Sequence, residues 1–208
     1  MIDYIKNPAT IYARSFEIIR AEVDLSSLPS DAHAIAIRVI HACGMTEIIS
    51  DLVITEDFIN AAKNALIEKR PVLVDVEMLR HGIIARQLPE DIEIICTLND
   101  PRAREIGIEK SITRTAAAVE LWKDRLSGAI VVIGNAPTAL FRLLELIDQG
   151  WPKPACIVAM PVGFVGAAES KAELIANNRG IPYATIKGRK GGSAMASSVI
   201  NALTGDQQ

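Results

Sequence analysis

Aromatic residues, cysteine and histidine are all scarce in this 208-residue chain. Phe, Trp and Tyr make up only 4% of the sequence although 50% of it is hydrophobic, so the core must consist of Ile, Val, Leu and Ala. The formal net charge is -3 and no basic run is present, which argues against a nucleic-acid partner. No stretch approaches the roughly 20 apolar residues that a membrane span requires, so we expect no membrane association.

Metal-binding and disulfide patterns are also missing. The three cysteines are Cys43, Cys96 and Cys156, and the three histidines are His33, His41 and His81. None of them forms a CxxC or HExxH spacing, so we expect neither a disulfide framework nor a protein-bound metal. The N-terminal residues show no secretory signal pattern, and we expect a cytoplasmic protein.

The first third of the chain has the pattern of helices. Asn7 and Pro8 suit the N-cap and first position of a helix, in which Ile11, Ser15 and Ile18 recur at helical spacing. This spacing predicts a buried stripe with the Ser15 hydroxyl in its middle. A second helix is expected from about residue 30 to 43 with a glycine as its C-cap, and a third from residue 55.

From residue 71 onward, strand and helix patterns alternate. The predicted strands cover residues 71–76, 93–98, 129–133, 155–160 and 183–187, and the clearest helices cover 111–126, 136–149, 167–178 and 193–203. The strand segments are almost continuously apolar, as in strands that helices bury on both faces. We therefore predict one α/β domain over residues 1–208, with a mainly parallel, doubly wound sheet of five strands after an N-terminal helical segment.

Arg38 and His41 lie three residues apart on the second predicted helix, which places them on one face. A fixed cation beside an imidazole that titrates near neutrality can hold an anionic ligand and move a proton on it. A histidine on a half-apolar helix is, however, commonly a structural residue.

Two further features allow both a functional and an ordinary interpretation. The turn at 188–193 combines glycines with two cations, which suits an anion or a solvated turn, and it matches no nucleotide-binding glycine motif. Arg114 stands at the positive end of a predicted helix, where it either meets a ligand carboxylate or points into solvent. The carboxylates Glu47, Asp51, Asp75 and Glu77 show no two-carboxylate spacing, so we expect solvated or capping roles for them.

Five segments, in order along the chain, resemble the precorrin-8X methylmutase family of cobalamin biosynthesis. They are 9–20 (ATIYARSFEIIR), 38–45 (RVIHACGM), 134–140 (GNAPTAL), 160–165 (MPVGFV) and 187–193 (KGRKGGS). The resemblance implies an isomerase that moves a methyl group from C-11 to C-12 of a tetrapyrrole, precorrin-8X or its cobalt counterpart, to give hydrogenobyrinate or cobyrinate. It implies no cofactor, because the migrating methyl is already on the substrate, and it implies a homodimer.

The resemblance also assigns roles to residues. His41 matches the family's catalytic histidine, expected to protonate the macrocycle, while Ser15 and Arg38 match substrate-contacting positions. Arg114 and the 189–193 loop are further substrate contacts that the resemblance suggests. Two other classes stay open from the residues: a doubly wound nucleotide-binding enzyme, and a corrinoid-binding protein without turnover.

Overall fold

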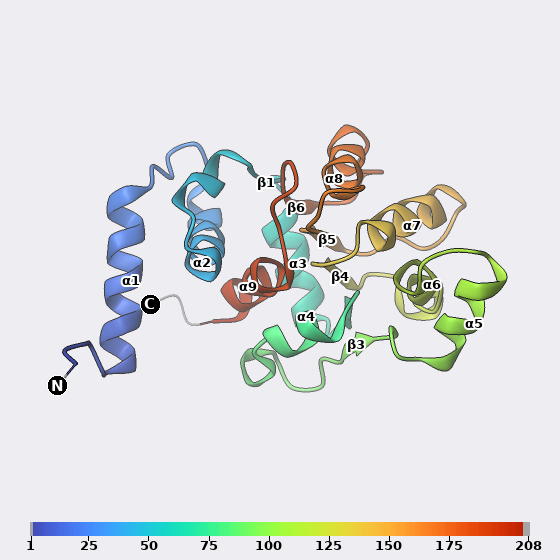
Figure 1. Ribbon diagram of the computed structural model, residues 1–208, viewed down its shortest axis with the longest axis horizontal. Coiled ribbons are helices and arrows are strands. Elements are labelled where there is room, and N and C mark those ends of the chain that lie inside the picture. Colours follow the sequence, from blue (N-terminus) through green and yellow to red (C-terminus); the bar gives the residue numbers. More distant parts are fainter. Residues whose placement is uncertain (1, 206–208) are drawn as a thin grey trace.

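A computed structural model describes residues 2–205 of the chain and shows a sheet with helices on both faces (Figure 1). The strand order is β1-β6-β5-β4-β2-β3, and all neighbouring strands are parallel except β1, which runs antiparallel to β6. The strands are β1 (Leu52–Ile54), β2 (Val72–Val74), β3 (Ile94–Cys96), β4 (Ile130–Ile133), β5 (Cys156–Ala159) and β6 (Tyr183–Ile186).

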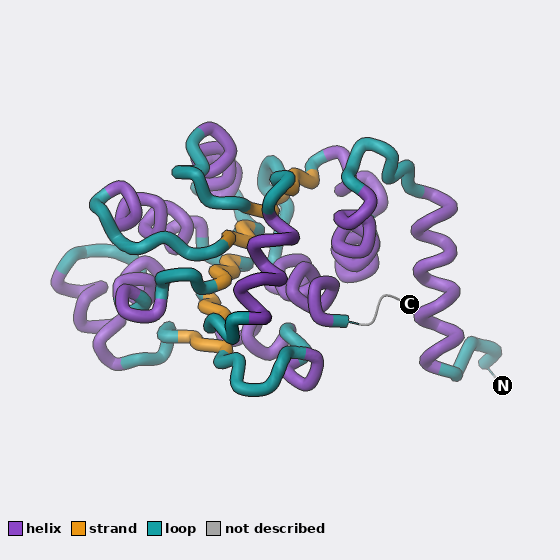
Figure 2. Tube along the Cα trace, turned by 180° about the vertical axis from the view of Figure 1, so that it is seen from behind, coloured by secondary structure: helices purple, strands orange, loops and turns teal. Residues whose placement is uncertain are grey.

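The helices divide between the two faces of the sheet. They are α1 (Pro8–Glu22), α2 (His33–Cys43), α3 (Phe58–Ile67), α4 (Glu77–Gly82), α5 (Pro101–Glu109), α6 (Arg114–Glu120), α7 (Pro137–Asp148), α8 (Ala167–Ala176) and α9 (Ser193–Thr204). Helix α9 packs against α2, α3 and α4 on one face, and α7 packs against α6 and α8 on the other. Helix α1 contacts α2 and lies at the outer edge of the molecule, as the ribbon and the tube show (Figures 1 and 2).

The doubly covered sheet explains why the strand segments are continuously apolar. In β4, Ile130 and Val132 belong to the core on the α9 face, while Val131 and Ile133 belong to the core on the α7 face. Successive strand side chains point to opposite faces, so a strand with helices on both sides must be apolar at every position. The predicted α/β class with a mainly parallel sheet is confirmed.

The predicted strand count of five is wrong, because the sheet has a sixth strand, β1. This strand is a short apolar run of three residues at the sheet edge, and it lies in the part of the chain whose pattern is otherwise helical, so the sequence does not mark it as a strand. The helix predicted over 111–126 is also too long: α6 ends at Glu120, and a 3-10 turn covers Lys123–Arg125.

The predicted buried stripe on the first helix is wrong as well. Ile11 and Ile18 are 45% and 40% exposed, and Ile19 is the buried residue of α1. The face toward α2 carries Tyr12, Ser15 and Phe16, so the helix is rotated by about one residue relative to the prediction.

None of the helices between residues 2 and 205 combines the length and apolar content that crossing a bilayer would need.

Candidate active site

The side chains of Ser15 and His41 meet between α1 and α2. The Ser15 Oγ atom lies 2.8 Å from Nδ1 of His41. Helix α1 is started by Asn7, whose side chain accepts from the backbone N–H of Thr10, and α2 ends at Gly44 in the left-handed conformation. These caps were predicted from the sequence, and they fix the two helices that bring the serine and the histidine together.

Two aromatic rings of α1 flank the His41 imidazole. The ring centroid of Tyr12 is 5.1 Å from that of His41 in a tilted arrangement, and the ring of Phe16 meets it edge-on at 5.4 Å. Positions 12, 15 and 16 share one helix face, so α1 presents a hydroxyl between two rings. The contacts restrict the imidazole to one orientation, with Nδ1 toward Ser15 and Nε2 left for another partner.

Arg38 completes this cluster from the preceding turn of α2. Its guanidinium carbon lies 5.9 Å from the ring centroids of both Tyr12 and Phe16. Partial burial lowers the pKa of His41 below its ordinary value, and the positive charge of Arg38 lowers it further. The free protein therefore holds a mostly neutral imidazole at neutral pH, beside a permanent cation.

A groove of about 520 Å³ opens beside this cluster, between α1, α2 and the turn at 84–87. Three arginines line it: Arg20, Arg38 and Arg86. The amide oxygen of Gln87, another lining residue, is buried and has no hydrogen-bond partner among the described residues. A groove with three guanidinium groups and a free acceptor suits a ligand that carries several carboxylates and an N–H group.

Sequence reasoning missed five of these residues, namely Tyr12, Phe16, Arg20, Arg86 and Gln87. Tyr12 and Phe16 carried a usable signal, because they lie on the same helix face as Ser15. Arg86 and Gln87 carried none, since they reach the groove through a short 3-10 turn, Ala85–Gln87, that no periodicity marks.

The glycine-containing turns gather at the carboxyl edge of the sheet, where ligands of such folds bind. The buried Asp75 carboxylate follows β2 and accepts the backbone N–H groups of Gly134, Asn135 and Ala136, which follow β4. A Cβ atom on Gly134 would lie 2.7 Å from a methyl of Leu79, so only glycine fits this turn. The expected capping role of Asp75 agrees with this geometry.

The comparisons with known proteins all identify the same family. The family model described as CbiC, precorrin-8X methylmutase, matches residues 10–205. The chain belongs to the precorrin-8X methylmutase family. A precorrin-8X methylmutase of Sinorhizobium sp is 51% identical over 97% of this chain and 96% of its own, and one of Pseudomonas aeruginosa is 48% identical over the full length of both.

More distant methylmutases match over similar lengths. A cobalt-precorrin-8 methylmutase of Methanocaldococcus jannaschii is 34% identical over 95% of this chain and 93% of its own. The solved structure of the precorrin-8x methyl mutase from Thermus thermophilus superposes with a TM-score of 0.85 at 32% identity, covering 94% of each chain. These findings support neither a nucleotide-binding enzyme nor a corrinoid carrier without turnover.

Arg114, a substrate contact suggested by the methylmutase resemblance, is not brought to the Ser15–His41 pair within one chain. It is exposed at the start of α6, which lies across the sheet from α1 and α2 (Figure 1). Close to it, the hydroxyl of Thr113 lies 2.7 Å from that of Thr138 and 3.1 Å from that of Thr115. This polar surface faces solvent in the isolated chain.

The two other histidines lie apart from the Ser15–His41 pair. The Nε2 atom of His33 lies 3.2 Å from the Leu28 carbonyl oxygen at the start of α2, and His81 is exposed near the end of α4. Among the residues that the structure describes, no three His, Cys, Asp or Glu side chains are placed to hold a metal ion.

Proposed function

We propose that this chain is a precorrin-8X methylmutase that moves the methyl group from C-11 to C-12 of the macrocycle and yields hydrogenobyrinate. Family membership supports the reaction, and the 2.8 Å contact between Ser15 and His41 supports the site. The rearrangement is intramolecular, so we propose no cofactor.

The metal-free macrocycle is the substrate we favour. The relatives named for precorrin-8X share 51% and 48% of their residues with this chain, whereas the relative from Methanocaldococcus named for cobalt-precorrin-8 shares 34%. A difference of this size over nearly equal alignment lengths supports membership in the metal-free branch.

His41 is the residue we assign to proton transfer. Its Nδ1 is occupied by Ser15, so Nε2 is the atom that faces the macrocycle. Once protonated, the imidazolium donates Nδ1–H to the Ser15 oxygen and delivers the Nε2 proton to a ring nitrogen, which draws electrons from the ring and favours methyl migration. Nε2 of His41 takes the proton back after the methyl group has moved, so no net proton is consumed.

Binding of the substrate itself charges the histidine. Partial burial and, to a smaller extent, the positive charge of Arg38 lower the pKa of His41 in the free protein. A macrocycle carrying several carboxylates would neutralise Arg38 and add negative charge near the imidazole, which raises the pKa of His41. The acid is therefore formed mainly when substrate is present.

Ser15, Arg38 and Arg114 are the substrate-binding residues we assign, with the 189–193 loop as a further contact. Arg38 lines the groove beside His41 and is placed to pair with an acetate or propionate group. Arg114 lies too far around the fold to reach the same groove within one chain, so its assignment depends on a second subunit.

A homodimer is the assembly we propose. Helix α1 and the residues before it expose Ile2, Tyr4, Ile5, Ile11 and Ile18. An apolar outer face beside a substrate groove is typical of a surface that a partner covers. A second subunit there would close the groove around a ligand as large as a tetrapyrrole. We also propose the cytoplasm as the location, in line with a biosynthetic enzyme.

The deciding experiment is incubation of the purified protein with precorrin-8X while the visible absorption spectrum is recorded. The proposal predicts conversion to the hydrogenobyrinate spectrum without added cofactor. A parallel incubation with cobalt-precorrin-8 tests the branch, since the metal-free compound should turn over faster. Binding without spectral conversion of either compound would refute the proposed activity.

A further inference from the structure

Lys171 is a wholly buried lysine of α8, with 0% of its surface exposed. Its Nζ atom donates a hydrogen bond to the backbone carbonyl oxygen of Lys190 at 2.6 Å. Lys190 belongs to the glycine-containing segment between β6 and α9, which we call the 187–192 loop. The lysine thus links the interior beneath α8 to one loop at the carboxyl edge of the sheet.

Three other contacts hold the same loop. The N–H of Lys187 donates to the Asp51 carbonyl at 2.8 Å, and the N–H of Gly192 donates to the Met160 carbonyl at 2.8 Å. The Arg189 carbonyl accepts from the N–H of Gly163 at 3.3 Å. These contacts hold the two ends of the loop, at Lys187 and Gly192, and the carbonyl of Arg189. The bond from Lys171 holds the next carbonyl, that of Lys190.

At Gly191, the loop packs closely on the turn that follows β5. A Cβ atom on Gly191 would lie 2.3 Å from the Met160 carbonyl oxygen, so the backbone rests directly on the preceding turn. Gly188 has a φ of +74°, in the left-handed region. The N–H groups of Gly188, Arg189, Lys190 and Gly191 donate to no backbone carbonyl within residues 2–205. The fixed conformation therefore leaves a row of donors free.

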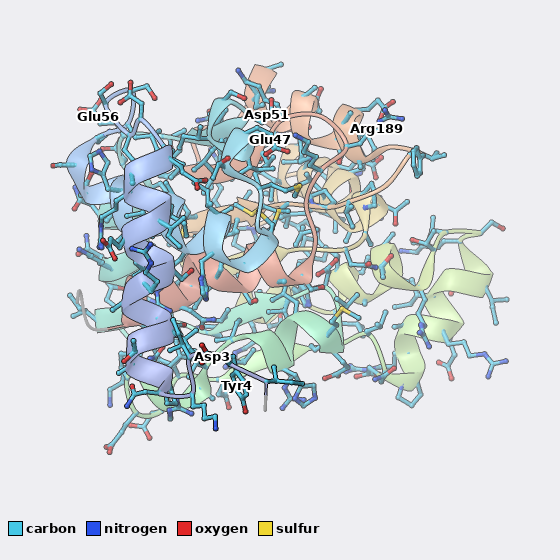
Figure 3. All side chains as sticks on the ribbon, turned by 60° about the vertical axis from the view of Figure 1, so that its left-hand side comes forward. Asp3, Tyr4, Glu47, Asp51, Glu56 and Arg189 are labelled. Carbon is cyan, nitrogen blue, oxygen red and sulfur yellow. The ribbon has the colours of Figure 1, made fainter. Side chains whose placement is uncertain are left out.

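The charges around the loop are divided between its two sides. The Lys190 ammonium lies 3.7 Å from an Asp51 carboxylate oxygen and 3.9 Å from one of Glu47. Arg189 is exposed, and Figure 3 shows it away from Glu47 and Asp51, which lie together. The guanidinium of Arg189 is held over the ring of Phe164 at 5.1 Å. The side of the loop that carries Arg189 is therefore cationic. On the other side, Asp51 and Glu47 neutralise the charge of Lys190.

The loop also lies beside the helix that carries His41. The Lys190 ammonium is close enough to Cys43, near the end of α2, to oppose the effect of burial, which raises the pKa of that thiol. Cys43 lies two positions after His41 and therefore points to a different face of α2. A ligand that reaches both the loop and the groove beside His41 must therefore be large, as a tetrapyrrole with acidic groups around its periphery is.

Burying a lysine side chain costs more free energy than burying an apolar side chain of the same size. Methionine would occupy a similar volume without the cost of removing an ammonium group from water. Burial lowers the pKa of Lys171 to about 8, and the nearby Asp51 carboxylate acts in the opposite direction. The side chain makes one hydrogen bond among the described residues, and that bond is to the loop. The geometry points to Lys171 as the positioning residue that holds the 187–192 loop so that Arg189 and the free N–H groups bind substrate carboxylates.

This inference rests on the proposed methylmutase function, and it can be tested separately from it. Lys171→Met removes the donor at nearly constant volume. We expect the variant to bind hydrogenobyrinate about ten-fold more weakly in an absorbance titration. The charge-assisted hydrogen bond from Lys171 to the loop is lost, so the loop no longer holds its donors toward the product carboxylates. Its binding should also depend less steeply on salt. The single-turnover rate of bound substrate should stay within about three-fold of the wild-type rate, because His41 is untouched.

Hydrogen exchange separates positioning from general destabilisation. We expect faster amide exchange in residues 187–192 of Lys171→Met, with unchanged exchange in the core strand β4. The matched control is Lys153→Met, since Lys153 also donates to a backbone carbonyl, that of Arg179 at 2.5 Å, but is exposed and lies away from the loop. The control should bind product as the wild type does.

If Lys171→Met does not fold, Lys171→Arg takes its place. Arginine keeps the charge and the donors on a longer, planar group, so it must displace the Lys190 carbonyl and weaken product binding to a smaller extent. Wild-type product affinity in folded Lys171→Met, or in Lys171→Arg with faster exchange in residues 187–192, would overturn the assignment while leaving the methylmutase function intact. Lack of conversion by the wild-type protein would instead refute the function.

Discussion

Ser15 and His41 are 26 residues apart in the sequence, yet their side chains lie 2.8 Å apart in the structure. The contact joins the outermost helix, α1, to the helix that packs on the core, and the rings of Tyr12 and Phe16 flank it. It assigns Nδ1 of the histidine to a protein partner. The reactive nitrogen of the proposed mechanism is consequently Nε2.

Replacement of Ser15 by alanine should have a moderate effect on binding. A neutral hydrogen bond contributes about 0.5–1.5 kcal/mol, so Ser15→Ala should weaken product binding about two- to ten-fold. Absorbance titration with hydrogenobyrinate measures this change. Ser50→Ala is the control, because the Ser50 hydroxyl also makes one local hydrogen bond, to the Glu47 carbonyl, on an exposed turn. Equal affinities in wild type and Ser15→Ala would remove Ser15 from the site.

Replacement of Arg38 should weaken binding more strongly. Hydrogen bonds to charged groups contribute about 1.5–3 kcal/mol, so Arg38→Ala should raise the product Kd roughly ten- to a hundred-fold. The loss should shrink as salt is added, because ions screen the interaction with the carboxylates. A product Kd within two-fold of the wild-type value would argue that the groove does not hold a carboxylate at this position.

The same substitution should raise the pKa of His41. Partial burial, and to a smaller extent the charge of Arg38, lower that pKa below its ordinary value of 6.5, so loss of the guanidinium leaves burial as the remaining cause. NMR titration of the histidine ring protons in Arg38→Ala should therefore show one of the three histidines titrating at a higher pH than in wild type.

The free energy of unfolding of the wild-type protein should fall as the pH drops below about 6.5, because the unfolded chain then binds more protons.

His33 and His81 should be dispensable for the reaction. His33 lies beside a backbone carbonyl, His81 is exposed, and neither contacts the groove beside His41. Asn or Gln at either position should leave the single-turnover rate within about three-fold of wild type. A loss of a hundred-fold or more at either position would mean that the proton passes through a relay absent from the present mechanism.

Release of product should limit steady turnover. Substrate and product carry the same carboxylates, so the arginines and loop N–H groups bind both equally and cannot favour release. We expect a burst of product followed by a slower steady phase that salt accelerates. Product formation that is linear from the first turnover would show that the chemical step limits the rate.

Much of the sheet could be predicted because its central strands are buried on both faces. Ile130–Ile133 and Cys156–Ala159 are apolar at every position for that reason, and such runs are visible in a sequence. Strand β1 was missed because its apolar run, Leu52–Ile54, is only three residues long and lies in the part of the chain whose pattern is helical. The caps at Asn7 and Gly44 could be predicted because their side-chain and backbone requirements are local.

The site was predictable only in part. Arg38 and His41 share a face through helical spacing, but their approach to Ser15 depends on how the chain folds back between α1 and α2, which no spacing encodes. The resemblance to the family assigned Ser15 and His41 to one site, but it did not predict the contact between them. Lys171 was not predicted, because an apolar helix face with one lysine normally places its ammonium in solvent, whereas here the whole side chain is buried.

The single-turnover rate of His41→Ala with precorrin-8X tests the central claim most directly. General acid catalysis contributes about 10²–10⁴-fold, so the variant should convert bound substrate that much more slowly while remaining folded and binding hydrogenobyrinate with an affinity near that of wild type. His81→Ala, which removes an exposed histidine from α4, serves as the control and should react at the wild-type rate. Conversion by His41→Ala at a rate close to that of wild type would show that the proton comes from another group and that the assignment of His41 is wrong.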